Sequence, residues 1–248
     1  MTSHWNCAKL FKKCLASLVL YGLALGSLAQ TDVRKSGTYF LSPQLQALQN
    51  DADKNPAQLW ISRGQILWQA NCVSCHHGIT SMASNVASFP KLNRDKKLVN
   101  LEDAIEGHAG IKPSSEEVLA LSAALHQAAK GEAIHAQPIE PHYSRGQQLW
   151  NTRIGRINLA CAHCHDVANG RVGANMKAEV ISQAQPTGFP IYRMSWQSLG
   201  TLERRLRACY SGVQAPLPPL GSPELRDLEL FLKVRANGMP IEGPSVRR

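Results

Sequence analysis

The sequence predicts an all-α fold made of two tandem domains. The first observation is an internal repeat: Arg63–Trp68 (RGQILW) recurs as Arg145–Trp150 (RGQQLW), and a C-x-x-C-H motif follows each copy. The second is that apolar residues downstream of each motif recur at the three- and four-residue spacing of an amphipathic helix. The third is that no stretch sustains the alternation of apolar and polar residues that is typical of a strand.

Start and stop signals locate the downstream helix of each repeat. Ser114–Glu117 fits a capping box, which marks the beginning of a helix. In the second repeat, Ser222–Pro223 places a proline in the first turn, and Asn237–Gly238 closes the helix. Between the repeats, Gln137–His142 contains two prolines and cannot continue a helix, so it is the expected linker.

The composition is that of a globular protein with one or two domains. Hydrophobic residues make up 44% and charged residues 18% of the 248 residues, which excludes a disordered chain. With the linker at its predicted position, we expect an N-terminal domain over residues 30–137. The C-terminal domain then covers residues 138–248.

The first 29 residues have the pattern of a cleaved secretory signal peptide. Lys9, Lys12 and Lys13 precede an uncharged apolar run over Cys14–Ala29, which ends in small residues suited to cleavage after Ala29. The alternative is a membrane anchor, but the run is shorter than the roughly 20 residues that span a bilayer. We therefore expect residues 1–29 to be removed on export, leaving no membrane span. Loss of the three lysines lowers the net charge from +9 to +6.

The cysteines indicate the chemistry. Of the seven, two lie in the signal peptide and four form the two C-x-x-C-H motifs, which leaves one. This motif is typical of covalent c-type haem attachment, because two thiols add to the two vinyl groups of one porphyrin and the histidine binds the iron. A shared zinc ion would need the two cysteine pairs close together, yet they start 89 residues apart, and a redox dithiol would need a βαβ pattern. We therefore expect two haem c groups in two tandem cytochrome c-like domains. The predicted haem residues are Cys72, Cys75 and His76 in the first motif and Cys161, Cys164 and His165 in the second.

The second axial ligand decides between an electron carrier and an enzyme. In the C-terminal domain the candidates are Cys209, Met176, Met194 and Met239. Arg205 lies four residues before Cys209 on the same face of a predicted helix, and a neighbouring cation favours the thiolate. The alternative is a buried, inert cysteine in an electron carrier whose haem is ligated by Met194. The residues alone leave both interpretations open.

Three segments of the C-terminal half are distinctive. They are Pro186–Trp196 (PTGFPIYRMSW), Arg204–Cys209 (RRLRAC) and Leu230–Pro240 (LFLKVRANGMP). They resemble the SoxA family, the catalytic haem subunits of the periplasmic sulfur-oxidising SoxAX cytochromes. The likeness is most specific from Cys161 to Pro240 and extends to Gln65–His76, Ser81–Met82 and Leu98–Ile105.

This resemblance implies an oxidative conjugation, in which thiosulfate is joined to a cysteine of the carrier protein SoxYZ and two electrons leave through haem. It implies that Cys209, modified to a persulfide, is the catalytic residue and the distal ligand of the second haem, opposite His165. It also implies that Arg205 binds the substrate, and a guanidinium fork does match a small dianion. The expected partner is a small SoxX-like c-type cytochrome in a heterodimer, and the expected location is the periplasm.

The sequence departs from the family pattern in the first domain. Two-haem members commonly place a distal cysteine after a Leu-Glu-Asp segment, but here no cysteine lies between His76 and Cys161. Aligning Leu101–Ile105 puts His108 where that cysteine would be. We therefore expect His76 and His108 to bind the first haem iron, and the rival distal ligands are His126, His135 and Met82.

Two other functions remain open to such a chain. One is a thiosulfate dehydrogenase that joins two thiosulfates into tetrathionate, although the comparable dihaem enzymes carry the ligand cysteine in the first domain. The other is a non-catalytic dihaem electron-transfer cytochrome. The positive net charge favours an anionic substrate and an acidic partner. Nucleic-acid binding is not expected of an exported chain that has no dense basic run.

Overall fold

The structure is a computed structural model that describes residues 33–108, 110–176 and 179–248. The predicted signal peptide, residues 1–29, lies outside the described residues. Within the part of the chain that is described, no helix has both the length and the apolar character that crossing a membrane requires.

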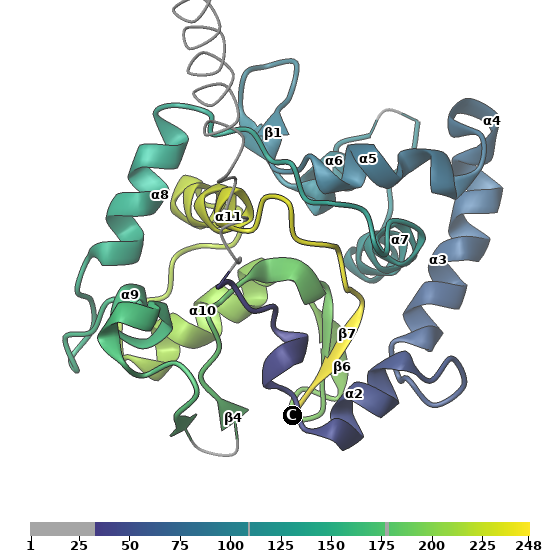
Figure 1. The fold of residues 1–248 in the computed structure, drawn as a ribbon. Helices are drawn as coiled ribbons and strands as arrows, with labels where there is room; N and C mark the ends of the chain where they lie inside the picture. The colour runs from purple at the N-terminus through teal and green to yellow at the C-terminus, as the bar shows by residue number, and fades with distance from the viewer. Residues whose placement is uncertain (1–32, 109, 177–178) are drawn as a thin grey trace, which may run out of the picture. The chain divides into compact units, whose positions relative to one another are not determined.

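Helices make up most of the regular structure, as the sequence predicts (Figure 1). The α-helices are α2 (Pro43–Asn50), α3 (Gln58–Asn71), α4 (Val73–His76), α5 (Ala83–Ala87), α6 (Leu101–Glu106), α7 (Ser115–Ala128), α8 (His142–Asn151), α9 (Cys161–His165), α10 (Leu202–Gly212) and α11 (Pro223–Arg235). Short 3-10 turns lie at Thr38–Phe40, Ile79–Met82, Val167–Asn169 and Pro186–Gly188.

Short strands accompany the helices. They are β1 (Lys91–Leu92), β2 (Leu98–Val99), β3 (Asn175–Met176), β4 (Glu179–Val180), β5 (Ile191–Arg193), β6 (Ser198–Gly200) and β7 (Ser245–Arg247). β1 pairs with β2 and β3 with β4, while β5 pairs antiparallel with β6 and parallel with β7. The sequence predicts none of them, because two or three residues are too few to form an alternating pattern. The fold is therefore predominantly helical, with a small sheet added in the C-terminal half.

In the first half, α3 packs against α7 (Figure 1), and Gly64 of the repeated segment lies at the contact. A Cβ atom at Gly64 would lie 2.0 Å from the carbonyl oxygen of Ala120, so the close approach requires glycine. α7 begins at the predicted capping box. The Ser114 hydroxyl accepts a hydrogen bond from the Glu117 N–H at 3.4 Å, and the Glu117 carboxylate accepts one from the Ser114 N–H at 2.8 Å. Arg63, next to the glycine, pairs with Glu116 at 3.2 Å.

The second half repeats this crossing with α8 and α11. A Cβ atom at Gly146 would lie 2.1 Å from the carbonyl oxygen of Asp227. Ser222 caps α11 by accepting a hydrogen bond from the Leu225 N–H at 3.5 Å, with a proline in the first turn as predicted. Arg145 donates to the Asp227 carboxylate at 2.6 Å. The repeated glycine is thus a helix-packing position and the repeated arginine an ion-pair position.

Three hydrophobic clusters form the core: one around Trp68, one around Trp150 and a smaller one of Ala57, Ile61, Ala123 and Leu199. The C-terminal segment joins the first of them, where Met239 and Ile241 are buried. The Ile134 N–H donates to the Met239 carbonyl at 2.9 Å, and β7 then pairs with β5. Contacts therefore join residues 35–248 into one unit, and the division after residue 137 stays a prediction.

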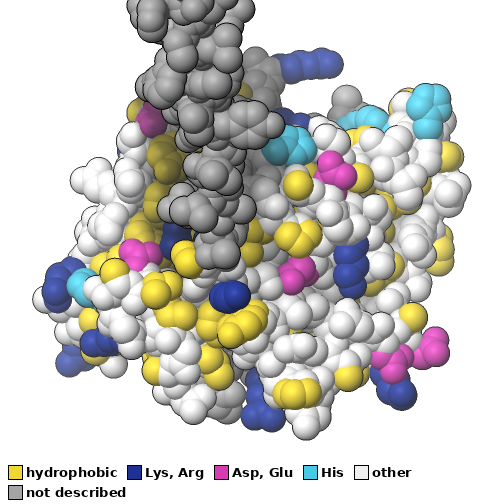
Figure 2. All heavy atoms as spheres, in the orientation of Figure 1, with side chains coloured by type: hydrophobic (Ala, Val, Ile, Leu, Met, Phe, Trp, Pro, Cys, Tyr) yellow, Lys and Arg dark blue, Asp and Glu magenta, His cyan; other side chains and the backbone are white. Residues whose placement is uncertain are grey.

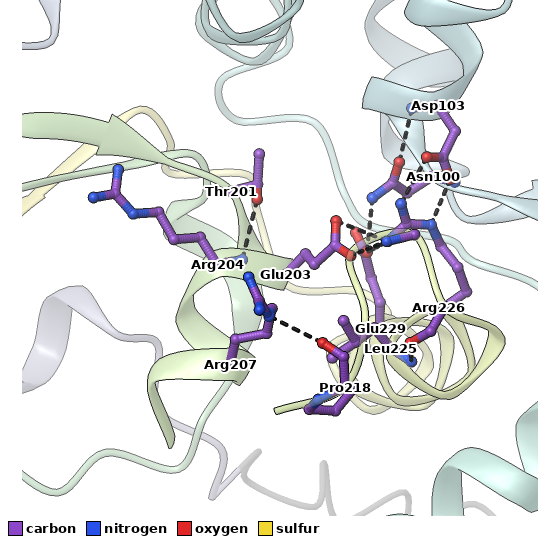
Figure 3. Close-up of polar contacts among 12 residues, drawn as sticks. Asn100, Asp103, Thr201, Glu203, Arg204, Arg207, Pro218, Leu225, Arg226 and Glu229 are labelled. Carbon is purple, nitrogen blue, oxygen red and sulfur yellow. Dashed lines mark hydrogen bonds and ion pairs between the residues drawn. The ribbon is translucent and has the colours of Figure 1, made fainter. Parts of the chain in front are cut away.

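A buried ion cluster around Arg226 of α11 ties the helices together (Figure 3). Arg226 is only 4% exposed. Its guanidinium donates to Asp103 of α6 at 2.6 Å and pairs with Glu203 of α10 at 3.3 Å and with Glu229 at 3.8 Å. The Asn100 side-chain amide also donates to Glu229, at 3.0 Å. Burial raises the pKa of Glu229 to about 7, in spite of the charge of Arg226.

Gly146→Ala should lower the free energy of unfolding by about 1–3 kcal/mol, because the added methyl group meets a backbone carbonyl and the two helices must separate. Denaturant unfolding measures the change. Gly212 at the end of α10 is the matched control, since no described neighbour lies within 4 Å of its Cβ position. Gly212→Ala should have no effect or add up to about 1 kcal/mol. Equal losses in both variants would contradict the role of the crossing.

Candidate functional site

The first C-x-x-C-H motif begins at Cys72, directly after α3, and its other four residues form the short helix α4. Trp68 of the repeated segment donates its indole N–H to the carbonyl oxygen of His77 at 3.2 Å, and its ring lies 5.9 Å from that of His76. The Nε2 atoms of His76 and His108 are 3.2 Å apart. His108 follows α6, the helix that Arg226 holds through Asp103. The structure thus brings together the two residues predicted to ligate the first haem.

The second motif forms α9 and has an equivalent tryptophan. Trp150 donates its indole N–H to the Asp166 carboxylate at 3.3 Å, and its ring lies 6.0 Å from that of His165. His165 Nδ1 is 2.7 Å from the carbonyl oxygen of Ser182. Because a carbonyl can only accept, Nδ1 carries the proton, which leaves Nε2 as the metal-binding nitrogen. A histidine held in this way is the usual arrangement for a metal ligand.

Electrostatic interactions locate Arg205 and Cys209 beside this motif. Burial raises the pKa of Cys161 to about 12, and the neighbouring Cys209 raises it as well, so the two thiols are close. Burial also lowers the pKa of His165, and the positive charges of Arg205 and Arg235 lower it further. The hydrogen bond to Ser182 acts in the opposite direction. The structure therefore gathers the predicted residues of the second site around one histidine.

α10 presents Arg205 and Cys209 together. The helix begins at Thr201, whose hydroxyl accepts a hydrogen bond from the Arg204 N–H at 3.2 Å. Arg205 and Cys209 are one helical turn apart, and both are half-buried. The face that packs into the second hydrophobic cluster consists of Leu202, Leu206 and Tyr210.

The neighbouring arginines are engaged elsewhere. The Arg204 guanidinium lies 4.2 Å from the centre of the Trp196 ring and donates to the Ser198 hydroxyl at 2.8 Å. Arg207 donates to the carbonyl oxygen of Pro218 at 3.0 Å (Figure 3). Of the three, Arg205 is the arginine whose charge acts on His165.

These arrangements fit a covalent haem at each motif. Each pair of cysteines flanks one helical turn that ends in a histidine, and none of the five described cysteines forms a disulfide. An imidazole faces His76, and a cysteine lies near His165, so each site has a candidate for the opposite axial position.

The rival ligands occupy other surroundings. His126 is buried, with Nδ1 2.9 Å from the Ser122 carbonyl oxygen, and burial lowers its pKa to about 3. His135 is exposed and bonds the Ala133 carbonyl at 3.0 Å. The rival methionines differ in burial: Met82 and Met239 pack with the first cluster, whereas Met176 and Met194 are exposed.

No protein-family model matches the chain. A curated relative from Paracoccus pantotrophus, the L-cysteine S-thiosulfotransferase subunit SoxA, is 30% identical over 234 residues, which cover 87% of this chain and 80% of the relative. The chain belongs to the SoxA family. The SoxA subunit of Chlorobaculum thiosulfatiphilum is 27% identical over 257 residues, covering 90% of this chain and 89% of the relative. Among solved structures, the crystal structure of SoxXA from P. pantotrophus matches with a TM-score of 0.78 at 28% identity and covers 87% of each chain.

Membership of the SoxA family confirms the resemblance seen in the sequence. It also confirms that the chain is a haem-binding cytochrome subunit, as the C-x-x-C-H motifs predict. The structural match supports the predominantly helical cytochrome fold.

Sequence reasoning missed two contacts of the second motif. They are the Ser182 carbonyl that orients His165, and the ion pair of Asp166 with Arg235 at 3.1 Å. A backbone acceptor leaves no signal in a sequence. The ion pair could have been suspected from the repeat, because the residue after the motif is histidine in the first copy and aspartate in the second.

Proposed function

We propose that the chain is the SoxA subunit that joins thiosulfate to a cysteine of a sulfur carrier protein. In this reaction the carrier thiol and the outer sulfur of thiosulfate form a new S–S bond, and one proton and two electrons leave. The sulfonate group is retained in the product. The curated relatives are named for this class of transfer, as L-cysteine S-thiosulfotransferase subunits.

The observation that carries this proposal is the pairing of Arg205 and Cys209 on one turn of α10, beside His165 and Cys161. A cysteine next to a cation is the usual setting of a reactive thiolate. A cysteine that served only to fill the core would not need a half-buried guanidinium one turn away. Cys209 is thus the proposed catalytic residue, carrying a persulfide sulfur, and the proposed distal ligand of the second iron.

Each residue around the second motif has a separate role. Cys161, Cys164 and His165 would hold a haem c, which supplies a one-electron acceptor next to Cys209. The Ser182 carbonyl keeps the proton of His165 on Nδ1, so Nε2 stays directed to the metal. Arg205 binds and orients thiosulfate, because its planar fork can donate two hydrogen bonds to the sulfonate oxygens.

A second haem c would be held by Cys72, Cys75 and His76, with His108 as the other axial ligand. The facing Nε2 atoms of the two histidines support this pair. With both histidines bound to the iron, the group held here would supply electron transfer and would leave no place for substrate.

The proposed partners are a small SoxX-like c-type cytochrome, which receives the electrons in a periplasmic heterodimer, and a SoxYZ-like carrier that brings the thiol. The solved relative is a SoxXA structure, which supports the first of these. On the face shown in Figure 2, Lys and Arg side chains form separate groups instead of one continuous patch. We expect the local charge of Arg205 to attract thiosulfate to the second motif.

Cys209→Ala should abolish conjugation while both haems remain attached, because the thioether cysteines are unchanged. The measurement is mass spectrometry of the carrier protein after incubation with thiosulfate and the haem-loaded heterodimer. Ser211→Ala, an exposed change on the same helix, is the matched control and should retain activity. Full conjugation by Cys209→Ala would refute the mechanism, and tetrathionate formed without the carrier would identify a thiosulfate dehydrogenase instead.

Arg205→Gln should lower kcat/KM for thiosulfate by roughly 10- to 100-fold, which corresponds to the loss of a charge-assisted hydrogen bond of about 1.5–3 kcal/mol. Arg205→Lys should recover only part of the loss, because an ammonium cannot form the fork. Steady-state kinetics with varied thiosulfate checks both. Arg207→Gln removes the same charge from α10 at a position bonded to Pro218 and should change kcat/KM little. Equal effects at positions 205 and 207 would show that only the total charge matters.

His108→Ala should convert the first haem from low spin to high spin, because one strong-field ligand is lost. Absorption and electron paramagnetic resonance spectra of the holoprotein detect the change, and the second haem serves as the internal standard. His135→Ala, which removes an exposed rival ligand, should leave both spectra as they are. Unchanged low-spin bands in His108→Ala would exclude His108 as a ligand.

A further inference from the structure

The internal repeat allows the two motif sites to be compared position by position. The repeated glycine meets Ala120 in the first helix pair and Asp227 in the second. Ala128 of α7 lies eight residues after Ala120, and Arg235 of α11 lies eight residues after Asp227, about two turns along each helix. Each is the last residue of its helix. The second half therefore places a cation where the first half has a methyl group.

The residue directly after each motif also differs between the halves: it is His77 in the first and Asp166 in the second. In the first half the Trp68 indole donates to the backbone carbonyl of His77. In the second half the Trp150 indole donates to a side-chain carboxylate, that of Asp166. The position that contributes only backbone in one half thus supplies an anion in the other.

Arg235 and Asp166 belong to one cluster. Arg235 Nη2 lies 3.1 Å from Asp166 Oδ1, and the guanidinium carbon is 4.4 Å from the centre of the Trp150 ring. The other oxygen of Asp166 accepts the Trp150 N–H, so the tryptophan contacts both partners. About a fifth of the Arg235 side chain (22%) is exposed, so solvent screens its charge only in part. These contacts therefore hold a cation and an anion at fixed positions next to the second motif.

The charge of Arg235 reaches the residues that would hold the haem. It is among the groups that act on both His165 and Cys161, and Asp166 acts on His165 in the opposite direction. A fixed cation near a redox centre stabilises the form that carries one more electron, and a fixed anion destabilises it. The two charges therefore have opposite effects on a haem at this motif.

We propose that Arg235 and Asp166 are an electrostatic pair that sets the reduction potential of the haem at the second motif and not at the first. Arg235 is a positioning residue: Asp166 and Trp150 hold its cation beside His165, where it favours the reduced haem. Because the role requires a haem at the second motif, it rests on the proposed function. Arg235 thereby makes the haem next to Cys209 a better acceptor for the electrons released when the new S–S bond forms, and Asp166 limits this effect.

The test is a spectroelectrochemical titration of the haem-loaded holoprotein in which the two haems are followed separately. Arg235→Gln should lower the midpoint potential of the second haem, because Asp166 is left unpaired beside it. Asp166→Asn should raise it, and the double variant should return toward the wild-type value. Arg235→Lys keeps the charge and should shift the potential little. A purely structural role would not give shifts of opposite sign.

Arg63→Gln is the matched control, because it removes an arginine charge from the exposed ion pair with Glu116 in the first half. It should leave the second potential unchanged, and the first haem should keep its potential in all variants at positions 166 and 235. Shifts of the same sign in Arg235→Gln and Asp166→Asn, or no shift in either, would overturn the inference. Conjugation by the same wild-type preparation tests the proposed function separately. A fully active preparation with unshifted potentials therefore refutes the electrostatic role alone.

Discussion

The close crossing of two helices at a glycine is the constraint on which the rest of the structure depends. It occurs twice, at Gly64 and at Gly146, and in both places a side chain would collide with the backbone of the partner helix. Because the crossing fixes the helix, it fixes the tryptophan that follows one turn later. That tryptophan bonds the residue after the C-x-x-C-H motif in each half. The short repeated segment thus positions the motif histidine next to a packed pair of helices.

The Arg226 cluster connects the two halves of the structure. Arg226 binds α6, which leads to His108, and α10, which carries Cys209, through carboxylates that are far apart in the sequence. Both distal candidates are therefore held against the same helix. Burying one guanidinium among several carboxylates is favourable only when the charges are compensated, so loss of a single partner should be felt at both sites.

Local signals predict much of this molecule. The capping box at Ser114–Glu117 predicts where α7 begins, and Ser222–Pro223 predicts where α11 begins. What the sequence could not predict depends on partners remote in the chain. Ile191 pairs with Ser245 in a strand of three residues, and Arg226 binds Asp103 across 123 positions. Neither contact has a local pattern, because the residues become neighbours only after the helices pack. The ion pair of Arg235 with Asp166 likewise joins residues 69 positions apart.

The central claim is that Cys209 is the catalytic sulfur and carries an additional sulfur atom. Mass analysis of the purified, active holoprotein, with the Cys209 peptide isolated before and after reduction, tests it most directly. The account predicts a fraction of peptides one sulfur heavier, which reductant converts to the unmodified thiol together with a loss of conjugation activity. A fully active preparation in which every Cys209 is an unmodified thiol would contradict it.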